Sequence, residues 1–379
     1  MERFALSRMK EWKENENRKP LIIRGARQVG KTWIMKTFGQ QYFEKTAYVN
    51  FDNNARMKQV FEGDLDIERL VLSISAETGV SIEAENTLII FDEIQEVPKA
   101  LTSLKYFHEN APQYAIVAAG SLLGVALHQG TSFPVGKVDF LDLYPLNFRE
   151  FLCAMGEKQF VSMLDSCDTQ MVTVFKTKYI ERLREYYFVG GMPEVVKDFS
   201  EKKDYNRVRA IQKNLINYYQ QDFSKHAEIK LVPRLNLVWN SIPMQLAKEN
   251  KKYIYGQVRE GSRAKDFELA IQWLLDCGLI HKVQRIQKPD LPLKAYIDFD
   301  AFKLFLVDIG LLIAMTDLDA KVIIEGNKIF TEFKGSLTEQ YILQQLISDV
   351  GVIPYYYSTQ NSKGEIDFLV QGKTSVIPI

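Results

Sequence analysis

The stretch Ile22–Lys36 reads IIRGARQVGKTWIMK and places Gly25, Gly30, Lys31 and Thr32 directly behind a short aliphatic run. These four positions satisfy the Walker A pattern G-x-x-x-x-G-K-[ST]. The glycines permit backbone angles that turn successive N–H groups around a phosphate, the lysine reaches the β and γ oxygens, and the threonine hydroxyl binds Mg²⁺. The stretch therefore predicts a phosphate-binding loop made of Gly25, Ala26, Arg27, Gln28, Val29, Gly30, Lys31 and Thr32.

The residues on either side of this loop support that interpretation. Residues 21–23 are aliphatic and predict a short buried strand before the loop. Behind it, Trp33 or Ile34 recurs with Phe38 at helical spacing. The resulting order of strand, loop and helix would place the phosphates of a bound nucleotide on a helix N-terminus.

An acidic pair further along the chain completes the expected nucleotide site. Residues 88–91 read LIIF and predict a fully buried strand, and Asp92 and Glu93 follow at its end. Asp92, as in a Walker B motif, would hold the Mg²⁺ shell together with Thr32, and Glu93 would polarise an attacking water. An acidic pair after an aliphatic run is common by itself, but it gains weight beside this loop. We therefore expect ATP and Mg²⁺ as the cofactors.

Further strands complete a predicted parallel α/β sheet. The segment YAIVAAGS ends in Ser121, a small polar residue where the γ-phosphate or the lytic water would be sensed. A serine after a strand is also often only a helix cap, so this alternative stays open. Residues 48–51 and 137–146 predict two more strands. Lys31, Glu93 and Ser121 are thus the candidate catalytic residues.

Composition limits the class of protein. With 379 residues the chain predicts two or three domains, and 48 basic against 48 acidic residues give no overall preference for a polyanion. The three cysteines are far apart, which disfavours a disulfide framework or a zinc site. The N-terminus has no apolar core like that of a signal peptide, and residues 115–127 are too short to span a bilayer. We expect a cytoplasmic protein without a membrane partner.

Several motifs together resemble a known family. RGARQVGKT, IIFDEIQ, AAGS, LYPLNFREF, YFVGGMPEVV, YYQQDFSKH and GEIDFLV occur in this order along the chain. They look like those of the bacterial and archaeal AAA-type ATPases in which the ATPase domain is followed by a C-terminal domain of unknown function. The resemblance covers essentially the whole chain. Its Walker motifs are generic, whereas GARQVGKT together with DEIQ and PLNFREF is much more specific.

The resemblance implies an ASCE-type core, with an extra strand between the loop strand and the Asp92 strand and with Glu93 as the water activator. One position departs from the family, whose members usually carry Gly-Arg before the fifth strand, because Gly136 is followed here by Lys137. A lysine keeps the charge but loses the bidentate geometry of arginine. No arginine finger is therefore assigned; Arg149 is an alternative, and a solvated helix residue is the simpler interpretation of it.

The middle of the chain carries a local positive charge. Residues 205–265 contain twelve Lys and Arg against four Asp and Glu, a net charge of +8 that could neutralise several DNA phosphates. The pattern suggests a winged helix, with helices at 234–250 and 262–278, the second capped by Ser262 and Gly278, and a wing strand at 279–286. Winged helices in ATPases also serve as lids or protein contacts, so a protein partner or a homo-oligomer remains the alternative to DNA.

The C-terminal end resembles part of a restriction-type nuclease core. Glu339 on a predicted helix and Asp367 in the strand segment GEIDFLV match the first metal ligands of PD-(D/E)xK enzymes. The Glu-x-Lys pair of the next strand is absent up to Ile379. A structural role for a nuclease-like remnant and an ATP-regulated nuclease that continues beyond this sequence are both open.

These observations predict four parts: an AAA-like P-loop ATPase domain at 1–155, a helical connector or lid at 156–204, a basic winged-helix-like region at 205–300 and a partial PD-(D/E)xK-like α/β domain at 301–379. The favoured function is a Mg²⁺-dependent ATPase that couples hydrolysis to domain movement, with DNA as a candidate partner through residues 205–265. The alternatives are a nucleotide-gated protein-interaction switch with little turnover and the ATP-regulated nuclease.

Overall fold

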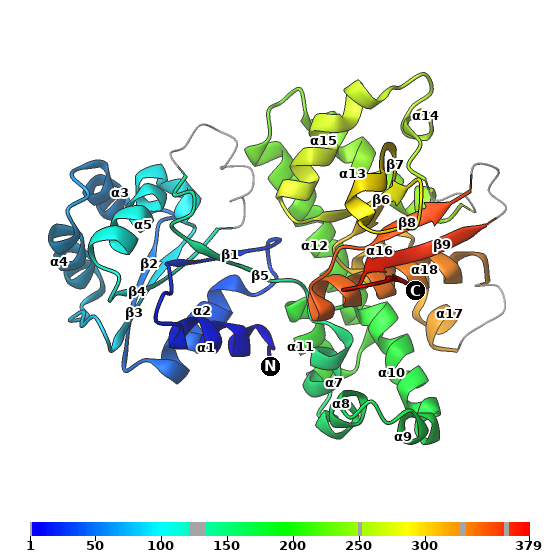
Figure 1. The fold of residues 1–379 in the computed structure, drawn as a ribbon, viewed down its shortest axis with the longest axis horizontal. Helices are drawn as coiled ribbons and strands as arrows, with labels where there is room; N and C mark the ends of the chain where they lie inside the picture. Colours follow the sequence, from blue (N-terminus) through cyan, green and yellow to red (C-terminus); the bar gives the residue numbers. More distant parts are fainter. Residues whose placement is uncertain (1, 121–132, 249–251, 326–330, 360–363) are drawn as a thin grey trace. The chain divides into compact units, whose positions relative to one another are not determined.

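The computed structural model describes residues 2–379 apart from 121–132, 249–251, 326–330 and 360–363. The described chain divides into two compact units (Figure 1). The first is Arg3–Tyr144, and the second is Pro145–Ile379 together with Glu2. The boundary expected at residue 155 thus lies within the second unit. In the described part no helix has both the length and the apolar character needed to cross a bilayer.

The first unit is built on a parallel five-stranded sheet in the order β2-β3-β4-β1-β5. Strand β4 lies between β1 and β3, which is the extra strand that the resemblance implied. The strands are β1 Leu21–Arg24, β2 Lys45–Asn50, β3 Thr87–Asp92, β4 Ala115–Ala119 and β5 Asp139–Asp142. Every residue of β3 and β4 is buried, as the aliphatic runs predicted, since a parallel sheet is covered on both faces.

Helices flank this sheet in Figure 1. They are α1 Ala5–Glu14, α2 Lys31–Tyr42, α3 Ala55–Glu62, α4 Ile67–Thr78, the 3₁₀ turn η1 Ile94–Glu96 and α5 Pro98–Asn110. Helix α2 buries Ile34 and Phe38 completely, whereas Trp33 remains 43% exposed, which settles the choice between the two spacings. The buried face of α2 therefore fixes its N-terminal turn against the sheet, at the end of the phosphate-binding loop.

The second unit begins with helices and continues with a mixed sheet. Its helices before the sheet are α7 Phe148–Ala154, α8 Lys158–Asp165, α9 Thr169–Val174, α10 Lys176–Val189, α11 Pro193–Lys202, α12 Tyr205–His226, α13 Val232–Leu246, α14 Tyr255–Val258 and α15 Ala264–Asp276. The later elements are β6 Ile280–Ile286, η2 Leu293–Tyr296, β7 Ile297–Leu306, α16 Ile309–Met315, α17 Ala320–Ile324, α18 Thr331–Gln345, the π-helical turn η4 Leu346–Val350, β8 Tyr355–Ser358, β9 Glu365–Gln371 and β10 Val376–Pro378.

The second sheet joins segments that the sequence assigned to different regions. Its order is β10-β9-β8-β6-β7, with β6 antiparallel to β7 and parallel to β8. The expected wing strand is β6, and it also pairs with the C-terminal strand β8. The boundary expected at residue 300 falls inside β7. The second expected helix begins one residue later than predicted, because Arg263 and not Ser262 is its N-cap; the Arg263 N–H donates to Asp266 at 2.8 Å.

A glycine pair explains the motif YFVGGMPEVV. Gly190 has φ +73°, and a Cβ there would lie 2.2 Å from the Asp308 carboxylate; a Cβ on Gly191 would lie 2.1 Å from the Leu146 carbonyl. The Gly191 N–H donates to Asp308 Oδ2 at 2.6 Å, and Gln344 Nε2 donates to the same oxygen at 3.2 Å. Burial raises the pKa of Asp308 to about 6. The motif therefore builds an interior polar junction of the second unit.

Candidate functional site

The loop between β1 and α2 has the backbone shape that binds anions. Gly25, Gln28 and Gly30 have φ values of 144°, 64° and 95°, so left-handed residues interrupt the right-handed ones. This alternation forms the concave arrangement of N–H groups known as a nest. A Cβ on Gly25 would lie 2.1 Å from the Leu143 carbonyl oxygen. Only glycine fits there, which accounts for the first residue of the Walker A pattern.

The lysine of the loop is held at the loop backbone. Lys31 is 7% exposed, and its ammonium donates to the carbonyls of Gly25 and Ala26, each at 2.8 Å. The carbonyl of the buried Val29 accepts a hydrogen bond from Arg3 Nη1 at 3.0 Å. The same guanidinium donates through Nη2 to the Tyr144 carbonyl at 2.6 Å. The loop is thereby tied to both ends of the first unit.

The predicted metal-binding residues meet at Asp92, which is 3% exposed. Thr32 Oγ1 donates to Asp92 Oδ2 at 2.7 Å, and the Glu93 N–H donates to Oδ1 at 3.1 Å. Glu93 has φ +52°, a sparsely populated conformation for a non-glycine residue. Its carboxylate accepts a hydrogen bond from Gln95 Nε2 at 2.7 Å. The structure thus brings Thr32, Asp92 and Glu93 together at the carboxyl end of β3.

Two polar residues at this site were missed by sequence reasoning. The Tyr48 hydroxyl donates to Asp92 Oδ2 at 2.9 Å, and burial together with the Asp92 charge raises the Tyr48 pKa well above its usual value. The phenol therefore stays protonated and remains a donor. Lys36 Nζ lies 3.8 Å from the centre of the Tyr48 ring. A usable sequence signal existed for Gln95, which belongs to the DEIQ motif, whereas the position of Tyr48 beside Asp92 follows from the pairing of β2 with β3.

This donor set fits a Mg²⁺-nucleotide. Mg²⁺ keeps most of its water and takes one or two carboxylate or hydroxyl oxygens from the protein, plus phosphate oxygens. Thr32 and Asp92 supply such a pair. In the described ranges no cluster of three or more acidic, histidine or cysteine side chains is arranged to hold a metal ion. A site that shares its ion with phosphates is consistent with both facts.

The remaining sequence candidates have varied surroundings. Ser121 lies outside the described residues. Arg27 is partly buried and Gln28 is exposed, both in the loop. Lys137 is paired with Glu109 at 2.9 Å, and this contact lowers the pKa of the Glu109 carboxyl. The residue that replaces the family arginine thus has a partner within its own unit.

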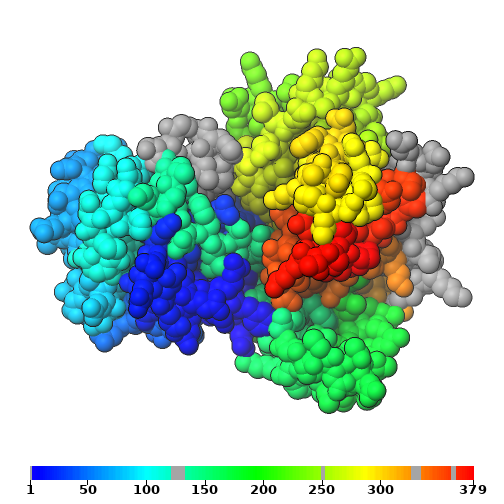
Figure 2. All heavy atoms as spheres, in the orientation of Figure 1, coloured from blue at the N-terminus to red at the C-terminus, as the bar shows by residue number. Residues whose placement is uncertain are grey.

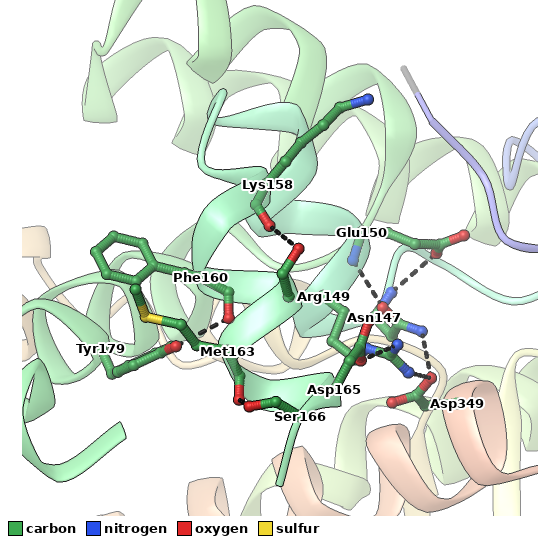
Figure 3. Close-up of polar contacts among 11 residues, drawn as sticks. Asn147, Arg149, Glu150, Lys158, Phe160, Met163, Asp165, Ser166, Tyr179 and Asp349 are labelled. Atoms are coloured by element: carbon green, nitrogen blue, oxygen red, sulfur yellow. Dashed lines mark hydrogen bonds and ion pairs between the residues drawn. The ribbon is translucent and has the colours of Figure 1, made fainter. Parts of the chain in front are cut away.

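Arg149 is anchored within the second unit (Figure 3). Its guanidinium pairs with Asp349 at 3.0 Å and also with Asp165. The preceding Asn147 caps α7, accepting from the Glu150 N–H at 2.8 Å while its own N–H donates to Glu150 Oε2 at 3.2 Å. The segment LNFRE in the motif PLNFREF therefore joins α7 to α8 and to the end of the α18–η4 segment. Arg149 is therefore a residue held by ion pairs within the second unit and not simply a solvated helix residue.

Residues 205–265 offer fewer unpaired cations than their net charge suggests. Arg207 pairs with Asp198 and Lys213 with Asp317, while Arg209 lies over the Phe188 ring at 4.6 Å. Lys251 lies outside the described residues. Seven cations of the window are exposed and have no ion pair with any described residue: Lys225, Lys230, Arg234, Lys248, Arg259, Arg263 and Lys265.

The nuclease-like carboxylates surround a buried lysine. Lys303 on β7 is 1% exposed, and its ammonium lies 2.6 Å from Glu365, 3.4 Å from Glu339 and 3.6 Å from Asp367. It also lies 4.8 Å from the centre of the Tyr356 ring. Sequence reasoning missed Lys303 because it lies on a strand far from both acidic motifs in the chain.

Comparisons with known proteins place these features in a family context. Residues 17–152 match the model of the AAA domain. Residues 180–322 and 334–379 match two models described as domains of unknown function, DUF8612 and DUF4143. No curated protein sequence matches the chain.

Solved structures extend the comparison. A Walker-type ATPase of Pyrococcus abyssi is 15% identical, with 83% of this chain and 95% of that chain covered and a TM-score of 0.50. Aeropyrum pernix Orc1 in complex with DNA is 13% identical over 82% and 91% of the two chains, with a TM-score of 0.29. At these identities only the first supports a shared fold, and it does so for the fold alone. The chain carries an AAA domain at residues 17–152, which makes it an ATP-binding ATPase, and the DUF4143 match covers its C-terminal end.

Proposed function

We propose that this ATPase hydrolyses ATP with Mg²⁺ at Gly25–Thr32 and uses the cycle to change how residues 205–265 contact DNA. The observation that supports the DNA contact is the set of seven exposed cations without ion pairs in the described part of the window. Cations that lack internal partners are the ones that phosphates can neutralise, with release of counterions. We also assign the activity to the cytoplasm, in line with the wide spacing of Cys153, Cys167 and Cys277 along the chain, which disfavours a disulfide framework.

The proposed roles follow from the chemistry of each side chain. Mg²⁺, when bound, neutralises charge on the phosphates. Thr32 and Asp92 hold its shell, and the loop N–H groups with Lys31 orient the β and γ phosphates. Glu93 accepts a proton from the water that attacks in line with the leaving oxygen. Gln95 and Tyr48 act as positioning residues, the first on Glu93 and the second on Asp92.

Coupling is the second half of the proposal. In this proposal hydrolysis releases the γ-phosphate that the loop binds and consumes the water that Glu93 polarises, so the first unit alternates between two states. We propose that the second unit moves in response and alters its affinity for DNA. Structures with and without a non-hydrolysable ATP analogue test this step, and identical domain positions in both would rule the movement out.

The direct test is steady-state ATP hydrolysis by the full chain, alone and with duplex or single-stranded DNA, at low and moderate salt. We expect stimulation that fades with salt, because phosphate contacts weaken by counterion competition. The variant R259A/R263A/K265A should lose the stimulation but keep the basal rate. The matched variant K176A/K197A/K321A removes three exposed lysines outside the window and should behave as wild type.

A different result would favour the nucleotide-gated switch. An unchanged slow rate with DNA, and no DNA binding at low salt, would point to a protein partner or a second copy of the chain. The pairing of Lys137 with Glu109 is the feature that agrees with slow turnover. A single-turnover rate equal to that of Glu93→Gln would support this alternative.

A second candidate function is a nuclease, favoured by the position of Lys303 among Glu339, Glu365 and Asp367. A lysine beside carboxylates is the chemistry that metal-dependent phosphodiester cleavage uses. Cleavage of DNA by the full chain with Mg²⁺ or Mn²⁺, abolished in Asp367→Asn and retained in Lys31→Ala, would establish it. Absence of cleavage would leave Lys303 with the structural role of an internal ion-pair partner.

A further inference from the structure

A second concave site lies in the C-terminal unit, far along the chain from the phosphate-binding loop. It is a pocket of about 790 Å³ beside strands β6, β8 and β9. Its polar lining includes Lys282, Gln284, Lys294 and Gln371, and Tyr355 provides an aromatic wall. This volume is within the range of pockets that bind small organic ligands and cofactors.

Three segments that are distant in sequence build this pocket. Lys282 and Gln284 alternate along β6 and flank Val283, which is fully buried and fixes the strand. The turn η2 carries Lys294, and its neighbour Leu293 is fully buried, with an N–H that donates to Gln371 Oε1 at 2.9 Å. In Figure 2 the yellow segment after β6 lies against the red C-terminal strands. The two lysines are thus brought to one pocket by tertiary packing.

The charge of this pocket is of one sign. Both charged residues of its lining are lysines, and neither forms an ion pair with a described residue. Lys282 lies 4.3 Å from the centre of the Phe302 ring, and burial lowers its pKa. Lys288, in the segment after β6, has the more usual surroundings of a surface lysine, since its side chain is 61% exposed and pairs with Asp290 at 2.6 Å. The charge of Glu268 offsets part of the lowering of the Lys282 pKa, but Lys282 forms no ion pair within the described residues. A partly desolvated ammonium of this kind is stabilised further by an anionic ligand.

The other walls favour a ligand with a flat apolar part. Tyr355, Val352 and Pro354 line the pocket beside the lysines. An aromatic platform next to cations is the combination that binds a nucleobase and its phosphate. Gln284 adds an amide that can donate to or accept from a base edge.

We propose that this pocket binds a nucleoside monophosphate unit, with its phosphate at Lys282 and Lys294 and its base against Tyr355. The unit is either a free nucleotide or a nucleotide of a single strand. This site is separate from Gly25–Thr32 and from the seven cations of residues 205–265. It therefore does not rest on the proposed DNA-coupled cycle.

The test is equilibrium dialysis of labelled AMP against the full-length Lys31→Ala protein, in which the phosphate-binding loop does not contribute. We expect AMP to bind and adenosine to bind at least tenfold more weakly. K282A/K294A should weaken AMP binding at least tenfold, and K197A/K321A, which removes the same charge elsewhere, should not. Tyr355→Ala should weaken AMP about tenfold while leaving competition by inorganic phosphate unchanged.

Two controls distinguish a variant that has lost the AMP site from one that has lost its fold. K282R/K294R keeps the charge and should retain AMP binding, and the melting temperature of each variant is measured alongside. R259A/R263A/K265A should bind AMP as the parent does, so failure of the DNA-coupled function is distinguishable from failure of this site. Equal AMP affinity in K282A/K294A and the parent, or adenosine binding as tightly as AMP, would overturn the proposal.

The source of the ligand is resolved by competition. A 5′-phosphorylated oligothymidylate that displaces AMP at lower concentration than dTMP identifies a nucleic-acid strand as the ligand. In that case the binding of the strand should lose salt dependence in K282A/K294A by about 0.7 in log–log slope per phosphate contact. Displacement by dTMP alone identifies a free nucleotide. Displacement by neither would contradict the assignment of a nucleotide site.

Discussion

The two units use buried polar side chains in opposite ways. In the first, the buried charged residues Arg3, Lys31 and Asp92 all lie at or contact the phosphate-binding site. In the second, most buried polar residues are spread through the interior and bond to the backbone of the same unit, whereas Lys303 and Glu339 pair with each other. Conspicuous polar motifs therefore predict chemistry in one unit and packing in the other.

Glutamines show the packing role most clearly. Gln340 on α18 accepts from the Leu306 N–H at 3.0 Å and donates to the Leu306 carbonyl at 2.7 Å. Gln245 on α13 brackets Ile254 in the same manner, at 3.0 Å on both sides. In each case the side-chain amide bonds to both the N–H and the carbonyl of one residue, as a neighbouring strand would do in a sheet. The second unit uses these paired bonds where a helix meets the end of β7 at Leu306 or the irregular segment at Ile254, since an unpaired buried backbone group is costly.

The strongest test of this comparison lies in the first unit. Lys31→Ala should abolish tight nucleotide binding, and Glu93→Gln should bind ATP normally but lower kcat by roughly 10²–10⁴-fold, the usual contribution of a general base. Both variants should melt like wild type. Nucleotide binding and turnover assays check this, and wild-type turnover in both variants would refute the assignment of the loop.

The largest effect in the second unit should be on stability. Lys303→Met leaves Glu339, which is 6% exposed, without its lysine and should lower the free energy of unfolding by about 3 kcal/mol. ATP turnover per folded molecule should not change. Chemical denaturation and the ATPase rate measure the two effects. A lost ATPase rate with an unchanged unfolding curve would assign Lys303 to the ATPase cycle.

The buried Asp308 of the second unit should make the stability of the protein depend on pH. Its carboxyl is fully buried and has its pKa raised to about 6 from 3.8, so the folded state binds the proton more tightly than the unfolded state. This contribution to stability is present below pH 4 and is lost as pH rises to about 6. The melting temperature of wild type relative to Asp308→Asn should therefore rise by several degrees from pH 7 to pH 5. A pH-independent difference would show that the Asp308 proton is not linked to folding.

Arg149 should give the smallest effect. Its partly exposed ion pairs with Asp165 and Asp349 predict that Arg149→Ala lowers the free energy of unfolding by about 1 kcal/mol or less. ATP turnover should stay at the wild-type level, alone and in mixtures with Glu93→Gln protein. A large loss of turnover with unchanged stability would instead identify Arg149 as the trans-acting arginine.

The sequence predicted the first unit well because its signals are local. The aliphatic runs before Gly25 and Asp92 became β1 and β3, and the loop and acidic motifs follow those strands directly. Tyr48 was not predicted as a site residue because its contact with Asp92 depends on the sheet order, which places β2 beside β3. Such neighbours are decided by tertiary structure.

The second unit was harder to predict because its sheet is assembled from distant segments. The sequence pattern predicted the helices α13 and α15 and the strand β6. The pairing of β6 with β8 and the position of Lys303 were not predicted, since no local pattern links residues 280–286 with 355–358. Composition gives the net charge of residues 205–265, but it does not show that Arg207 and Lys213 have acidic partners outside this window.

The Arg3 guanidinium has a practical consequence for anyone who expresses this protein. The Arg3 side chain is 5% exposed and donates to the carbonyls of Val29 and Tyr144. A clone shortened by only four residues would keep every Walker residue and yet release the back of the nucleotide loop. We expect such a truncated enzyme to be a poor ATPase for reasons that no motif search would reveal.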